Sequence, residues 1–313
     1  MSDFSLPPPE HARRLTEQRN PRSMAIDRVT VGEALAILHA EDRLCCEAAE
    51  RCAPQVEQAI NLIVRAFKQG GRLVYVGAGT SGRLGVLDAS EQPPTYGVPP
   101  TMVQGIISGG IEALHSSVEG AEDQPELGAA AVAEKNIDAR DVVFGITTGG
   151  RAPFVLGALA EARARQAATI LLTCTPPLAG EESLADVQIH ALVGPEAITG
   201  STRMKAGTVT KLILNQVTTV AMVQLGKVYE NLMVDLRPTN NKLVDRACRI
   251  LGELAGLERT AALELLEASG MDLKVALVMA LGGIGRQAAA ERLAAADGHV
   301  AAAIRRIKDA RES

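Results

Sequence analysis

The sequence has few cysteines and histidines, and neither set has the spacing of a structural or metal site. Its five cysteines contain no CxxC pair, and an odd number argues against a disulfide framework. Its five histidines are scattered, without HExxH or another ligand spacing. We therefore expect neither a disulfide framework nor a metal centre.

Long hydrophobic runs and an excess of basic charge are also absent. No apolar run approaches the roughly 20 residues that span a bilayer, and the opening stretch MSDFSLPPPEHARRLTEQRN lacks the apolar core of a signal peptide. The net charge of −5 argues against a general nucleic-acid role. We expect a cytoplasmic protein with no membrane or nucleic-acid partner, in which local dipoles and a few placed cations would attract any anionic substrate.

The sequence does contain an alternation of strands and helices in its middle part. The strands are apolar throughout rather than alternating with polar residues, which indicates a parallel sheet covered by helices on both faces. The predicted fold class is therefore doubly wound α/β. Predicted strands cover 73–76, 102–107, 142–146, 169–173 and 187–192, and helices between them cover 111–118, 126–135 and 152–166.

The segments before this alternation differ in character. Residues 1 to about 23 are polar and contain prolines, so we expect an extended arm, in which Thr16–Asn20 is too polar for the core. Residues 31–69 have apolar positions at three- and four-residue spacing, which predicts two helices broken near Pro54.

The segments after the alternation are expected to be helical. The strands stop at Thr202, and a long apolar helix is predicted over 206–226. After residue 256 the chain is rich in Ala and Leu between turn signals, which predicts short helices. We predict two domains, an arm with the α/β domain over 1–255 and a small helical domain over 256–313.

The strand at 73–76 runs into a glycine loop, Gly77–Gly82, that formally matches G-x-G-x-x-G. A dinucleotide site also needs an acidic residue closing the second strand, and here that strand ends in Ile107-Ser108-Gly109-Gly110. A glycine turn at a helix N-terminus remains a suitable anion site. Gly79 and the hydroxyls of Thr80 and Ser81 favour a phosphate monoester, and a tight turn without a ligand is the alternative.

A second glycine loop, Thr147-Thr148-Gly149-Gly150, occupies the same strand-to-helix position later in the chain. In a parallel sheet both loops would lie at the carboxyl edge, where ligands bind in this architecture. The repetition is more specific than either loop alone.

Two glutamates are candidates for proton transfer beside these loops. A short helix is predicted after the first glycine loop. Glu91 follows this helix and precedes Pro93-Pro94, so we expect it in a rigid, non-helical segment. Glu122 lies past the second strand and its helix, and its position in the chain alone favours a solvated acidic turn there. Two carboxyl groups at one pocket can divide acid and base roles if their environments separate their pKa values.

A third polar, glycine-bearing segment, Thr199–Thr208, leads into the long helix. Arg203 and Lys205 could meet an anionic substrate, as could Ser201, and either Ser201 or Thr202 could cap the helix. Asn240 could likewise be a cap or a substrate contact.

Four strings in the sequence resemble the N-acetylmuramic acid 6-phosphate etherase family, whose members contain a sugar isomerase domain. They are GAGTSGRLGVLDASEQPPTYG, VEGAED, TGSTRMKAGT and NLMVDLRPTNNKL. The resemblance runs from about Thr16 through the C-terminal helices. It implies cleavage of the lactyl ether of N-acetylmuramic acid 6-phosphate with water, giving N-acetylglucosamine 6-phosphate and D-lactate.

The same resemblance implies roles for the two glutamates. Glu91 would protonate the departing lactate oxygen, and Glu122 would take the proton at C2 of the opened sugar. The reaction would be an elimination followed by hydration, without metal or organic cofactor, in a homodimer with its site near the subunit interface. Thr80, Ser81 and the loop Thr147–Gly149 would contact the phosphosugar.

One departure from the family pattern lies in the second loop. The family often reads Ser-Gly-Arg-Thr-Pro there, whereas this chain has Gly149-Gly150-Arg151-Ala152-Pro153, so two hydroxyls are absent. Two other functions use the same loops: a non-enzymatic phosphosugar sensor, as in the related glucokinase regulatory proteins, and an aldose–ketose isomerase of sugar 6-phosphates.

Overall fold

The computed structural model describes residues 14–177, 184–236, 238 and 240–312. The contacts divide the chain into two compact units, Met1–Ser90 with Thr101–Thr218, and Glu91–Pro100 with Thr219–Ser313. The predicted domain boundary at 255/256 falls inside the second unit, between two of its helices.

The first unit is built on a five-stranded parallel sheet, as the apolar strands predicted. Its strand order is β2-β1-β3-β4-β5. Every residue of the two central strands is buried, because helices cover both faces. The strands are β1 (Leu73–Gly77), β2 (Val103–Ile107), β3 (Val142–Ile146), β4 (Ala168–Thr173) and β5 (Val187–His190).

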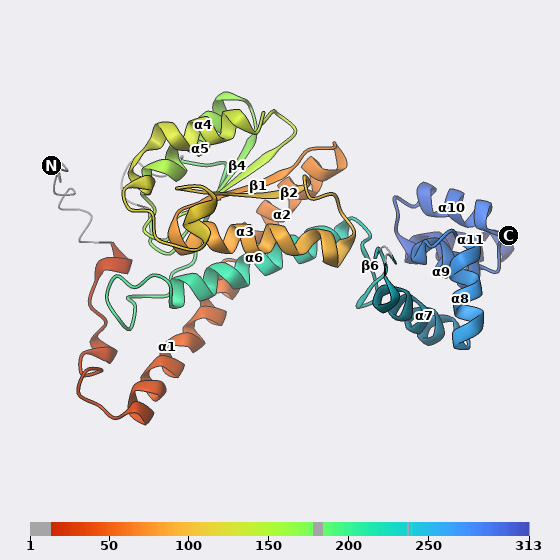
Figure 1. Cartoon of the computed structure of the whole chain (residues 1–313), viewed down its shortest axis with the longest axis horizontal. Coiled ribbons are helices and arrows are strands. Elements are labelled where there is room, and N and C mark those ends of the chain that lie inside the picture. Colours follow the sequence, from red (N-terminus) through yellow and green to blue (C-terminus); the bar gives the residue numbers. More distant parts are fainter. Residues whose placement is uncertain (1–13, 178–183, 237, 239, 313) are drawn as a thin grey trace. The chain divides into compact units, whose positions relative to one another are not determined.

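Helices pack on the two faces of this sheet (Figure 1). On one face, Val74 and Val143 of the sheet form a core with Phe154 and Val155 of α5 and with α4. On the other, α3 approaches β1 so closely that a Cβ on Gly85 would lie 2.8 Å from the Tyr75 Cβ. The helices of this unit are α1 (Val31–Arg51), α2 (Ala53–Lys68), α3 (Gly79–Tyr96), α4 (Pro125–Glu134), α5 (Pro153–Ala164) and α6 (Lys205–Gln224), of which α3 and α6 continue into the second unit.

The helix pair before the sheet begins and ends at local signals. Thr30 and Glu33 form a capping box at the start of α1. The predicted break lies at Cys52, and Pro54 stands in the first turn of α2, where its missing N–H costs no hydrogen bond.

Three predicted elements differ from the structure. The prediction that Thr16–Asn20 is too polar for the core is wrong at its two ends, because Thr16 and Asn20 are each only 2% exposed, whereas residues 17–19 are exposed. The predicted helix over 111–118 is a single 3₁₀ turn, Ile111–Leu114, which follows two glycines with positive φ. Strands also do not stop at Thr202, since β6 (Val228–Tyr229) and β7 (Leu232–Met233) form a small antiparallel hairpin. Residues 1–13 of the predicted arm lie outside the described residues.

The second unit contains a helical C-terminal region, as predicted. Its apolar core includes Leu251, Leu266 and Leu277. The helices are α7 (Asn241–Ala255), α8 (Arg259–Ala268), α9 (Leu273–Gly282), α10 (Arg286–Ala295) and α11 (Val300–Glu312). Within the described residues no single helix has the length and apolar composition to cross a membrane, and only the pair α9–α10, bent by 105°, meets those two criteria together.

Candidate active site

Both glycine loops lie at the topological switch point of the sheet. The chain leaves β1 towards β2 on one side, whereas β3, β4 and β5 follow on the other side of β1. β1 and β3 are hydrogen-bonded neighbours whose last residues, Gly77 and Ile146, are aligned. Ligands of open α/β sheets bind outside the carboxyl ends of the strands at such a point.

The first loop is shorter than the sequence suggested, because α3 already begins at Gly79. Thr80 and Ser81 therefore stand in the first helical turn, and Ser81 is only 7% exposed. Gly79 has a φ of +52°, which favours glycine. A Cβ on Gly82 would lie 2.7 Å from the Gly77 carbonyl oxygen, so the strand and helix meet at van der Waals limits.

The second loop is held in place by its own residues. The Thr147 hydroxyl accepts a hydrogen bond from the Ala152 N–H at 3.3 Å, and the Gly150 N–H donates to the Thr147 carbonyl at 2.9 Å. Thr147 is buried, whereas Thr148 and Gly149 are half-buried. Thr148 and Gly149, the middle residues of the loop, therefore remain partly accessible just before the start of α5.

Glu122 lines two cavities, one beside each glycine loop. A cavity of about 470 Å³ is lined by Glu122 together with Thr147, Thr148 and Gly149 of the second loop. A smaller cavity of about 260 Å³ is lined by Glu122 together with Gly79 and Arg83 of the first loop and α3. Glu122 is thus placed between the two predicted anion sites.

The surroundings of Glu122 suit a group that gains and loses a proton. Neighbouring protein atoms displace water and raise the pKa of the Glu122 carboxyl, and the negative charge of Asp123 raises it further. The side chain is nonetheless exposed, so water screens part of the effect. A raised pKa brings the group closer to the range in which it can exchange protons near neutral pH.

Glu91 lies within α3, and the expectation of a non-helical segment is wrong. The helix continues through Pro93 and Pro94 and ends only before Gly97, whose φ is +64°. The two prolines cost little there, because they stand in the last turns of the helix and remove only two backbone donors.

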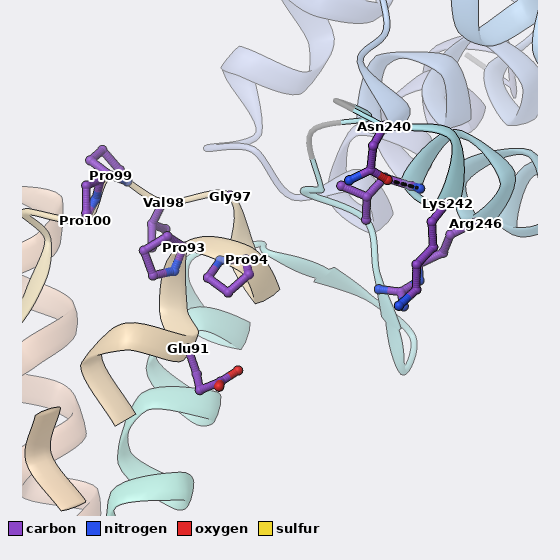
Figure 2. A pocket seen from close by; sticks show the side chains of 11 residues that line it. Glu91, Pro93, Pro94, Gly97, Val98, Pro99, Pro100, Asn240, Lys242 and Arg246 are labelled. Atoms are coloured by element: carbon purple, nitrogen blue, oxygen red, sulfur yellow. Dashed lines mark hydrogen bonds between the residues drawn. The ribbon is translucent and has the colours of Figure 1, made fainter. Parts of the chain in front are cut away.

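Glu91 is exposed and lines a cavity of about 960 Å³ in the second unit. Figure 2 shows this cavity with the Glu91 side chain and the prolines of the 91–100 segment. From α7 it is also lined by two cations, Lys242 and Arg246. Asn240, which also lines it, accepts a hydrogen bond from the Leu243 N–H at 3.0 Å and is the N-cap of α7.

Lys205 has partners inside the protein. Its side chain is 1% exposed, and Nζ donates to Glu41 Oε2 at 2.5 Å and to the Val193 carbonyl at 2.9 Å. Arg203 is exposed and Ser201 half-buried. Neither hydroxyl residue predicted as the cap of α6 has this role, because the buried Glu196 accepts from the N–H groups of Lys205 and Ala206 at 3.0 and 2.9 Å.

Sequence reasoning did not select several of the polar residues that line these cavities. Thr16 and Glu17 belong to the segment expected to lie outside the core, and Arg151 stands in the second loop beside the residues chosen. Arg83 donates to the carbonyl oxygens of Leu114 and Ser116 and is a cation beside the first loop. The position of the two arginines next to glycine loops was a usable signal, whereas nothing local indicated Thr16.

Fold and cavities together define an α/β protein with a polar ligand site at the switch point of a parallel sheet. Residues 55–163 match the family model of the glucokinase regulatory protein N-terminal SIS domain. Over 294 residues the chain is 50% identical to an N-acetylmuramic acid 6-phosphate etherase of Serratia proteamaculans, covering 93% of this chain and 98% of that protein. A second such etherase, from Gloeobacter violaceus, is 55% identical over 271 residues, covering 87% of this chain and 88% of its own.

Among solved structures, a phosphoheptose isomerase from Neisseria gonorrhoeae is similar with a TM-score of 0.45 and 17% identity, over 61% of this chain and 98% of that one. The length and identity of the two sequence matches establish the family of this chain. The chain belongs to the N-acetylmuramic acid 6-phosphate etherase family.

Proposed function

We propose that this protein cleaves the D-lactyl ether of N-acetylmuramic acid 6-phosphate with water, giving N-acetylglucosamine 6-phosphate and D-lactate. The observation that carries the proposal is 50% identity to an etherase over 98% of that enzyme's length. Such a reaction belongs to the recycling of cell-wall amino sugars.

The proposed chemistry assigns one proton transfer to each glutamate. Glu122 removes the C2 proton, which the neighbouring C1 aldehyde of the opened sugar acidifies, and the C3–O bond to lactate breaks. Glu91 donates the proton that the departing lactate oxygen needs. Water then adds at C3 of the unsaturated intermediate, with the two groups in reversed roles. The raised pKa of Glu122 supports its part in this scheme.

Release of D-lactate is the direct test of the activity. Purified protein incubated with N-acetylmuramic acid 6-phosphate is expected to release D-lactate and N-acetylglucosamine 6-phosphate in equal amounts. Folded protein that binds the substrate but releases no lactate would refute the proposal.

The role of Glu122 has a separate test. In deuterated water the wild-type protein is expected to exchange the C2 proton of N-acetylglucosamine 6-phosphate for deuterium, and Glu122→Gln is expected to abolish this exchange. Unchanged exchange in the variant would assign the base to another residue.

A second candidate function is phosphosugar sensing without turnover, which the match to the glucokinase regulatory protein domain favours. It predicts binding of the sugar phosphate with no lactate release. Glu91→Gln would then change affinity only modestly, whereas the etherase proposal predicts loss of turnover with binding retained.

We further propose that the protein works in the cytoplasm as a homodimer. The start of α1 supports self-association, since Val31 is 79% and Leu35 is 49% exposed. These two apolar side chains are four residues apart, so they lie on the same side of the helix.

A further inference from the structure

Residues Arg14–Ser23, which we name the N-terminal arm, contribute a wall to the cavity beside the second glycine loop. Thr16 and Glu17 line the 470 Å³ cavity that also contains Glu122 and Thr148. Thr16 is only 2% exposed although its sequence neighbours Glu17 and Gln18 are exposed. A polar residue is thus turned inward at the candidate site.

The arm is fixed to the body of the first unit on both sides of Thr16. Ahead of it, the Arg14 guanidinium lies against Gly150, where an added Cβ would be 2.8 Å from Nη1. Further bonds hold the rest of the arm: Leu15 N–H to Thr175 Oγ1 at 3.4 Å, Asn20 Nδ2 to the Pro195 carbonyl at 3.1 Å and Ser23 Oγ to the Ala197 carbonyl at 2.7 Å. Because these contacts come from several elements, the position of Thr16 is set before any ligand binds.

The Thr16 hydroxyl stands where the second loop has no side chain. A Cβ built on Gly149 would have Thr16 Oγ1 as its neighbour at 3.9 Å, with no other atom within 4 Å. Gly149 does not have a positive φ, so its backbone would accept a side chain. The space that a loop hydroxyl would occupy is therefore open and has a hydroxyl from the arm beside it.

The Thr16 hydroxyl is available to a stronger acceptor. Thr16 Oγ1 donates to Glu17 Oε1 at 3.5 Å, the outer limit for a hydrogen bond. Glu17, Glu122 and Asp123 make the cavity acidic, and Arg151 is the cation on its lining. A phosphate dianion bound in this cavity would be stabilised by each hydroxyl and N–H group that donates a hydrogen bond to it. Hydrogen bonds to a charged acceptor are stronger than those between neutral groups.

We infer that Thr16 is a ligand-binding residue: its hydroxyl donates to a phosphate oxygen of the bound phosphosugar and takes the place of a hydroxyl that the second glycine loop lacks. The inference rests on the proposed phosphosugar site and adds the N-terminal arm to it. The arm is then part of the binding site as well as of the fold.

The test is binding of N-acetylglucosamine 6-phosphate to the full chain, measured by titration calorimetry. Thr16→Val removes the hydroxyl at nearly constant volume and is expected to raise Kd about tenfold. Thr16→Ser keeps the hydroxyl and should stay within about twofold of the wild type. Thr260→Val, the same change at an exposed position of α8, serves as the control and should leave Kd unchanged.

Substitutions at Gly149 test the same contact without altering the arm. Gly149→Ala places a methyl group in front of the Thr16 hydroxyl and should weaken binding, whereas Gly149→Ser brings its own hydroxyl to that space. Adding Gly149→Ser to Thr16→Val should therefore recover most of the lost affinity. Gly149→Ala leaves the arm unaltered, so it decides the question even if Thr16→Val does not fold.

Three results would overturn the inference: Kd unchanged in Thr16→Val, an equal loss in Thr16→Ser, or Gly149→Ala binding as tightly as the wild type. Lactate release by the wild type is scored separately. A loss of affinity in Thr16→Val without any lactate release from the wild type would uphold the role of Thr16 and refute the etherase proposal.

Discussion

At the scale of single residues, the pairing of Glu122 with Asp123 is the feature with the clearest chemical consequence. Both stand in the 3₁₀ turn Ala121–Asp123, which follows Gly120 with a φ of +71°. The turn places two carboxyl groups side by side in the lining of the 470 Å³ cavity. Burial and Asp123 both raise the pKa of Glu122.

Removing the charge of Asp123 should therefore shift the pH dependence of catalysis. In the proposed reaction Glu122 must be ionised to accept the C2 proton, so kcat/KM should fall as the pH drops through its pKa in the free enzyme. Asp123→Asn lowers that pKa and should move the acid limb of the profile to lower pH, because the negative charge that raises the pKa of Glu122 is removed. Glu126→Gln, which removes a charge from the first turn of α4, should leave the limb in place. An acid limb that stays fixed in Asp123→Asn would show that another group controls it.

At the scale of elements, α6 begins inside the protein and is stabilised by residues distant in sequence. Glu196 accepts from its first two N–H groups, and Glu41 of α1 pairs with Lys205 in its first turn. Arg22 of the arm binds the same Glu41 carboxyl through Nε at 2.5 Å. One buried carboxyl group thus connects the arm, α1 and α6.

Breaking this buried pair should destabilise the first unit. Lys205→Met leaves Glu41 with one cation fewer in a water-poor site, and we expect a loss of about 3 kcal/mol in the free energy of unfolding. Urea denaturation followed by circular dichroism measures it. Arg249→Met, which breaks the exposed pair with Asp245 in α7, should cost less than about 0.5 kcal/mol. Equal losses in the two variants would contradict a structural role for Lys205.

The same carboxyl group makes stability depend on acid. Burial raises the pKa of Glu41, but hydrogen bonds from Arg22 and Lys205 outweigh it and lower the pKa from 4.5 to about 2. A lowered carboxyl pKa contributes stability that is fully present above pH 4.5 and is lost as the pH falls towards 2. Glu41→Gln should be less stable at pH 6, and its difference from the wild type should shrink between pH 4.5 and 2. A constant difference across that window would contradict this linkage.

At the scale of the whole molecule, the chain consists of two compact units, each of which contains one of the two catalytic candidates. Glu122 belongs to the unit built on the parallel sheet, and Glu91 to the unit that contains the C-terminal helices. α3 carries the chain from the first glycine loop, in one unit, to Glu91, in the other. The exposed apolar residues of α1 are a further property at this scale, because they bear on self-association.

Introducing a charge at the start of α1 should dissociate the proposed homodimer. Leu35→Glu places a carboxylate on an apolar surface and is expected to give a monomer in size-exclusion chromatography with light scattering. Leu127→Glu is the matched control, because Leu127 is 45% exposed on α4 compared with 49% for Leu35, and it should leave the dimer intact. A dimeric Leu35→Glu protein would show that α1 does not form the interface.

Local sequence patterns were sufficient to predict much of this protein. The apolar runs at Leu73–Val76 and Val142–Ile146 are buried central strands, since a run without polar residues fits only a sheet covered on both faces. The glycine loops that follow them lie side by side at the switch point, as parallel strand order requires. The motifs around Glu91 and Glu122 also identify the family, which the matches over most of the chain confirm.

The tertiary structure decided the features that depend on partners far along the chain. Lys205 looks like a free cation in sequence, but its partner Glu41 is 164 residues away. Thr16 looks like part of an exposed arm, yet it is buried and lines the 470 Å³ cavity, because Leu15 and Asn20 on either side bond to Thr175 and Pro195. Glu91 looks as if it follows a helix, whereas α3 passes the proline pair and ends at Tyr96. Periodicity and turn chemistry act over a few residues, whereas burial and charge pairing are set by whichever segments the fold brings together.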